Sequence, residues 1–115
     1  MEFFNTIYFI AAIFGIGALI GMYLLSIIMK NEETPKYVAY IHGAFVGTGL
    51  ILLFCYAADT PGWTDVVIIF CVAAFGGVTF LIRDFMDKPL PKWFAVGHGL
   101  IAITGFTILL IRAFS

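Results

Sequence analysis

The sequence predicts an all-α fold: a four-helix transmembrane up-down bundle made of two helical hairpins that are parallel repeats of one another. Three observations lead to this fold class. The 115 residues are 63% hydrophobic and 11% charged, with a mean hydropathy of +1.08, whereas a soluble domain is about half apolar and about a quarter charged. The apolar residues gather in four stretches, each near the ~20 residues that cross a ~30 Å hydrocarbon core as a helix. The second half of the chain also repeats the first half.

The first apolar stretch, residues 4–29, is expected to be a spanning helix rather than a signal peptide. No basic segment precedes it, it is longer than the apolar part of a signal peptide, and no small-residue cleavage site follows it. Within it, "GIGALIGM" spaces Gly17 and Gly21 as GxxxG, a pattern that lets membrane helices approach closely. Packing inside the bundle is the favoured interpretation of this motif, and a homodimer is the alternative.

The other three predicted spans are 37–57, 64–85 and 91–114. The breaks between spans read "KNEETPK", "ADTPGWTD" and "MDKPLPK", and each contains proline and charged residues. Proline favours a helix start or a break, and charges resist burial in hydrocarbon. Because the connections are so short, sequential helices are expected to be antiparallel neighbours.

Basic residues predict the orientation of the bundle. Five of the six belong to the first and third connections, and one lies at the other end: Lys30, Lys36, Arg83, Lys88 and Lys92 against Arg112. By the positive-inside rule, segments 30–36 and 86–92 are cytoplasmic and both termini are extracytoplasmic. The expected location is therefore a membrane such as the bacterial inner membrane, with the lipid bilayer as the main partner.

The internal repeat has an offset of fifty-six residues. "PKYVAYIHGAFVGTG" at 35–49 and "PKWFAVGHGLIAITG" at 91–105 are identical at seven of fifteen positions, and weaker matches extend into the first and third spans. We interpret the chain as one transmembrane domain, 1–115, with repeat 1 at 4–57 and repeat 2 at 60–113. Each repeat contains two spans, so both enter the membrane from the same side and are related by a pseudo-two-fold axis along its normal.

The only two histidines of the chain, His42 and His98, occupy the same place in the two repeats. Each follows a lysine at the membrane edge by six residues, about 9 Å along a helix, so both lie at one depth. Their helices are diagonal partners in an up-down bundle, which separates the helix axes by about 14 Å when adjacent helices lie ~8–10 Å apart. Two imidazoles across such a diagonal suit a single iron held in a flat macrocycle. His42 and His98 are therefore the predicted axial ligands of one haem b.

Glycines accompany both histidines. Gly49 and Gly105, two helical turns further into the membrane, are expected to clear space beside a macrocycle. Gly43 and Gly99 directly follow the histidines and are expected to let the backbone come close.

Three basic side chains are expected near the haem propionates. Carboxylates cannot be buried as bare anions in hydrocarbon. Lys36 and Lys92, one per repeat, and Arg83 at the end of the third span lie toward the cytoplasmic edge and could neutralise them. Two alternatives stay open at this point: the lysines simply mark the membrane boundary, or Arg83 pairs with Asp84 or Asp87.

This arrangement resembles the membrane-embedded b-type cytochromes, helical bundles in which paired histidines from different helices clamp haem b. The matching positions are His42 and His98 as ligands and Gly49 and Gly105 as packing residues. The resemblance implies an electron-transfer or redox role in a membrane. Within the haem interpretation, quinone oxidation, haem delivery to another protein and redox sensing all stay open, and a quinone or a redox protein is the expected partner. The two histidines supply ligands for one haem per chain.

Competing functions follow from other interpretations of the same residues. The histidines could form interhelical hydrogen bonds in a small four-helix transporter or in an assembly subunit without haem. Proton-coupled export of cations is disfavoured because no Asp or Glu lies in the middle of a span. The net charge of −1 and the lack of a basic patch disfavour nucleic acid as a partner. No nucleophile with a base and no nucleotide motif is present, so independent catalytic activity is not expected.

Overall fold

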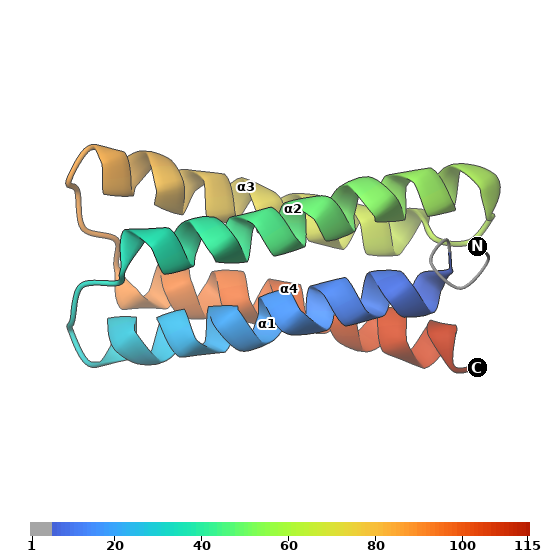
Figure 1. The fold of residues 1–115 in the computed structure, drawn as a ribbon, viewed down its shortest axis with the longest axis horizontal. Coiled ribbons are helices and arrows are strands. Elements are labelled where there is room, and N and C mark those ends of the chain that lie inside the picture. Colours follow the sequence, from blue (N-terminus) through green and yellow to red (C-terminus); the bar gives the residue numbers. More distant parts are fainter. Residues whose placement is uncertain (1–5) are drawn as a thin grey trace.

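The computed structural model describes residues 6–115, and every regular element among them is an α-helix. The helices are α1 (Ile7–Met29), α2 (Lys36–Asp59), α3 (Thr64–Phe85) and α4 (Lys92–Ala113). They run alternately up and down along a bundle 42 Å long (Figure 1). The predicted all-α four-helix bundle is confirmed, with helix ends within two residues of those expected where they can be compared. Residue 4, the predicted start of the first span and of repeat 1, lies outside the described residues.

The α1–α2 and α3–α4 connections have the same backbone conformation in both halves. Asn31 and Asp87, fifty-six positions apart, adopt the left-handed conformation with φ of 60° and 54° just after α1 and α3. The next amide in each turn bonds back to the last helical turn, Glu32 to the carbonyl of Ile27 at 3.1 Å and Lys88 to that of Arg83 at 2.9 Å. These are Schellman-type helix ends, which satisfy carbonyls that the helix itself leaves unpaired.

Prolines then start the second helix of each hairpin. Pro35 and Pro91 precede α2 and α4 with φ of −63° and −62°, the value that the proline ring imposes. Proline lacks an amide hydrogen, and the first amides of a helix have no intrahelical acceptor in any case. The repeated Pro-Lys pair is therefore the local signal that begins both histidine-bearing helices.

All four helices are long and apolar enough to cross a membrane. Large apolar side chains cover their outer faces; Leu19, Phe75 and Leu100 are 68%, 76% and 61% exposed. Within residues 6–115 no polar or charged residue is classed as buried. Apolar side chains thus lie both inside the bundle and on its outer surface, as expected for a bundle whose outer surface contacts lipid rather than water.

The helices form a four-membered ring in which α1 and α3 each pack against both α2 and α4. The diagonal pairs are therefore α1 with α3 and α2 with α4, as Figure 1 illustrates. The start of α1 and the end of α4 lie at the same end of the bundle (Figure 1). As predicted, the two histidine helices face each other across a diagonal.

The core is built from pairs of residues fifty-six positions apart. These pairs are buried in both halves: Ile7 and Trp63, Ile10 and Val66, Phe14 and Phe70, Leu53 and Leu109. At the centre, the rings of Phe14 and Phe70 stack on each other across the α1–α3 diagonal, with centroids 4.2 Å apart and planes 6° from parallel. The sequence repeat is thus also a repeat of core packing.

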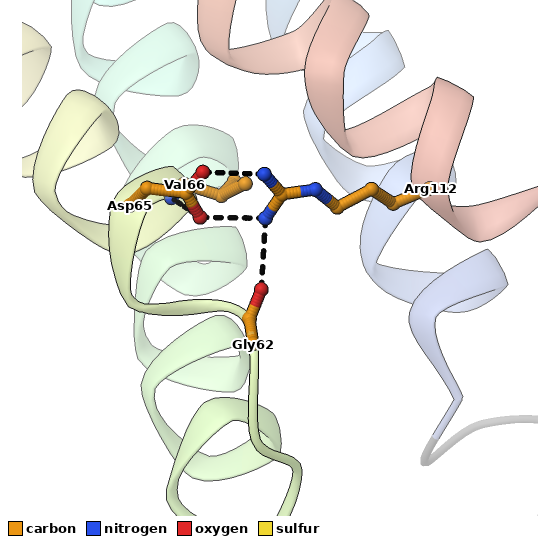
Figure 2. A network of polar contacts seen from close by, with 4 residues as sticks. All are labelled: Gly62, Asp65, Val66 and Arg112. Carbon is orange, nitrogen blue, oxygen red and sulfur yellow. Dashed lines mark hydrogen bonds and ion pairs between the residues drawn. The ribbon is translucent and has the colours of Figure 1, made fainter.

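An ion pair ties α3 to α4 at the end where the chain terminates (Figure 2). Arg112 donates from both terminal nitrogens to the carboxylate of Asp65 and, at 2.8 Å, to the carbonyl oxygen of Gly62. Its guanidinium carbon also lies 6.0 Å from the centre of the Trp63 ring. The first half has Tyr56 and Phe9 at the positions of Arg112 and Asp65, so this contact is specific to the second hairpin.

Candidate functional site

His42 is anchored to the helix that precedes it in its own hairpin. Its Nδ1 lies 2.8 Å from the carbonyl oxygen of Gly17 on α1. A carbonyl oxygen only accepts hydrogen bonds, so Nδ1 must carry the proton and donate it. The remaining ring nitrogen, Nε2, then holds a free lone pair, which is the form in which imidazole binds a metal.

His98 occupies the equivalent place in the second hairpin, but its Nδ1 is not bonded. That atom is buried and has no hydrogen-bond partner among the described residues. The equivalent carbonyl, on Ala73 of α3, interacts with His98 without reaching hydrogen-bond geometry. The phenyl ring of Phe80 also lies near His98, with the two ring centroids 5.7 Å apart and the ring planes at 65° to each other.

Glycines on α1 and α3 make room for the two imidazoles. A Cβ on Gly21 would lie 2.8 Å from Cε1 of His42. In the second hairpin a Cβ on Gly76 would lie 3.0 Å from Nδ1 of His98, and one on Gly77 would lie 3.6 Å from its Cε1. Each histidine therefore rests against helix backbone that carries no side chain.

These α1 and α3 residues were not among the site residues predicted from sequence. The GxxxG spacing of Gly17 and Gly21 indicates helix packing, and Ala73 and Gly77 occupy the equivalent positions fifty-six residues later. The signal that could have found them is the shared offset of fifty-six residues, which links this small-residue motif to the histidine repeat. We call His42, His98 and these small residues the histidine layer: Gly17, Gly21, Ala73, Gly76 and Gly77.

The histidine layer brings two imidazoles toward each other across the bundle. They lie at equivalent positions on the diagonal helices α2 and α4. Among residues 6–115 no three His, Cys, Asp or Glu side chains converge as a bare metal ion would need. The histidine layer therefore offers two imidazoles as potential nitrogen donors.

Gly49 and Gly105 lie against aromatic rings rather than open space. A Cβ on Gly49 would come within 3.0 Å of the Phe14 ring, and one on Gly105 within 2.9 Å of Ile69 and 3.4 Å of Phe70. Both glycines were expected to clear room beside a macrocycle. In the structure they receive the Phe14–Phe70 stack, which closes the centre of the bundle next to the histidine layer.

Gly43 and Gly99 have few close neighbours on other helices, and their predicted role beside a cofactor stays a prediction. A Cβ on Gly43 would meet no described atom within 4 Å, and one on Gly99 would meet only Leu25, at 4.0 Å. The reason is helical geometry: with 3.6 residues per turn, the residue after an inward-facing histidine is turned about 100° away. These two glycines do not line the histidine layer.

The predicted basic residues lie at the end of the bundle that is nearer the histidines. Lys92 donates from Nζ to the carbonyl of Met29 at 3.3 Å, and Arg83 donates from Nη2 to the carbonyl of Pro89 at 3.0 Å. Arg83 therefore bonds to backbone rather than to Asp84 or Asp87, and its buried Nε has no partner among the described residues. Lys36 is exposed at the start of α2.

Comparison of the chain with protein-family models, with curated proteins and with solved structures gives no significant match. The function is therefore argued from the histidine layer and its surroundings.

Proposed function

We propose that the chain binds one haem b per molecule, with His42 and His98 as its two axial ligands, and transfers electrons within a membrane. One observation carries the proposal. Two imidazoles occupy equivalent positions on diagonal helices, and each is set against glycine backbone of the neighbouring helix in its hairpin.

The donor chemistry of the histidine layer fits this group. Metal-binding histidines almost always donate their second ring N–H to a carboxylate, a backbone carbonyl or water, and His42 does so to Gly17. A porphyrin brings four nitrogen ligands of its own, so two imidazoles from the protein complete the coordination. Haem supplies one-electron redox chemistry when bound.

The residues around the imidazoles support the same assignment. Gly21 and Gly77 carry no side chain where His42 and His98 lie against α1 and α3, so each imidazole packs directly on helix backbone, and the two would hold the group from the α2 and α4 sides. The Phe14–Phe70 stack fills the bundle two helical turns further along the histidine-bearing helices, against Gly49 and Gly105. Lys36, Lys92 and Arg83 lie toward the other side; the last two bond only to backbone carbonyls and could exchange these for propionates.

The proposed setting is a membrane such as the bacterial inner membrane, with the basic end of the bundle in the cytoplasm and both termini outside. Five of the six Lys and Arg residues support this orientation. The proposed electron partner is a membrane quinone or another redox protein.

The test is an absorption spectrum of the protein purified in mild detergent, as isolated and after dithionite, with haem quantified per chain. We expect a Soret band and one haem per chain. The double variant His42→Ala, His98→Ala should be colourless yet fully helical by circular dichroism, because each span satisfies its own backbone.

A matched control is the double variant Thr48→Ala, Thr104→Ala, which alters an exposed residue at equivalent positions of the same two helices. It should keep the spectrum. The proposal is wrong if wild type expressed with ample haem shows no Soret band, or if the double histidine variant keeps it. The histidines would then serve interhelical bonding, transport or assembly.

A further inference from the structure

The two histidines are equivalent in sequence but differ in how the structure holds them. His42 donates its Nδ1–H to Gly17 at 2.8 Å, whereas Nδ1 of His98 is buried without a hydrogen-bond partner. The backbone on which they rest differs as well. A Cβ at Gly21 would lie 2.8 Å from His42, and one at the equivalent Gly77 would lie 3.6 Å from His98.

The second hairpin also places a second glycine against its histidine. Gly76, whose missing Cβ would lie 3.0 Å from Nδ1 of His98, corresponds to Ile20 in the first hairpin. His98 therefore lacks an orienting bond and sits against a pair of adjacent glycines. His42 has the bond and lies against a single glycine, Gly21.

We propose that these differences make the two axial positions unequal: His42 is the permanent ligand of the haem, and His98 is a displaceable ligand whose place a small neutral molecule such as carbon monoxide takes. This rests on the proposed haem function. With haem bound, His98 would be the residue that yields its place to the incoming molecule, an exchange of one neutral ligand for another that needs no electron or proton. The α4 side of the histidine layer is thereby a binding site for a small molecule.

The physical basis is the outer hydrogen bond. A carbonyl that accepts the second N–H of a ligating histidine fixes its tautomer and ring orientation and raises its basicity, and removing such a partner typically costs about 10–100-fold in metal affinity. His42 has this support and His98 does not. We therefore expect the contribution of His42 to haem retention to exceed that of His98 by about 10-fold or more.

The first experiment compares the single variants His42→Ala and His98→Ala, loaded with haem, in their transfer of haem to excess apomyoglobin. His98→Ala should hold haem about 10-fold or more tightly than His42→Ala. It should also respond fully to carbon monoxide after dithionite and regain the wild-type spectrum when imidazole is added. Equal retention by the two variants, or weaker retention by His98→Ala, overturns the proposal.

The second experiment needs no haem. In haem-free wild type with isotopically labelled histidine, NMR reports which ring nitrogen carries the proton. His42 should be a single Nδ1–H tautomer, and His98 should not be. Identical tautomers overturn the inequality even if haem binds. Absence of any Soret band in wild type, by contrast, rejects the haem function itself, so the two failures are distinguishable.

Discussion

Gly21→Ala is the most direct perturbation of the histidine layer. The new Cβ would lie 2.8 Å from Cε1 of His42, so the imidazole must retreat by roughly 0.6 Å to reach the 3.4 Å of ordinary contact. Cε1 is bonded to Nδ1, and Nδ1 donates to Gly17 at 2.8 Å. The retreat therefore lengthens the bond that fixes the tautomer of His42.

The expected change in stability is small because the contributions oppose one another. Overpacking costs about 1–3 kcal/mol, at the low end here since a side-chain ring gives way rather than backbone. Loss of one interhelical hydrogen bond in a membrane costs about 0.6 kcal/mol. Replacing Gly by Ala inside a helix recovers up to about 1 kcal/mol. The free energy of unfolding should thus fall by no more than about 1 kcal/mol, whereas haem affinity should fall about 10–100-fold through loss of the orienting bond.

The assay pairs haem transfer to apomyoglobin with denaturant unfolding in detergent. Gly77→Ala is the matched control, since it places the same methyl group at the equivalent position, 3.6 Å from His98 in ordinary contact. It should keep haem affinity and match or exceed wild-type stability. If Gly21→Ala keeps wild-type haem affinity, or if Gly77→Ala loses as much, the argument from the Gly17 bond is refuted.

Three further outcomes are expected. Gly49→Leu should lower both haem content and stability, because its side chain would displace the Phe14 ring, which lies 3.0 Å from a Cβ at that position. Gly43→Leu should change neither quantity, because a Cβ there meets no described atom within 4 Å. Equal effects of the two variants would contradict the assigned helix faces. Arg112→Gln and Asp65→Asn should each lower the melting temperature slightly. The double variant should lower the melting temperature no more than either single variant, because each substitution removes the same ion pair. Additive decreases would contradict the assignment of this ion pair. A reporter that works only in the cytoplasm should be silent when fused after the last residue, and strong activity would reverse the proposed orientation.

Much of the fold could be predicted from the sequence because its signals are local. Span length, proline and charge mark where each helix begins and ends, and the spans 64–85 and Thr64–Phe85 coincide. The fifty-six-residue offset placed His42 and His98 at equivalent positions on diagonal helices, which the packing of the four helices bears out. Both inferences use only distance along the chain and the order of the helices.

The sequence by itself therefore determined the four apolar helices, their up-down order and the equivalence of the two histidines. Only the tertiary structure decided what each histidine contacts. His42 donates to the Gly17 carbonyl, whereas Nδ1 of His98 has no hydrogen-bond partner among the described residues. The structure also decided that the stacked rings of Phe14 and Phe70 pack against Gly49 and Gly105. The physical reason is that helices apolar on every side carry no polar stripe to reveal which face turns inward. Their rotation about their own axes is set by close packing against neighbours, through small residues whose partners lie on other helices.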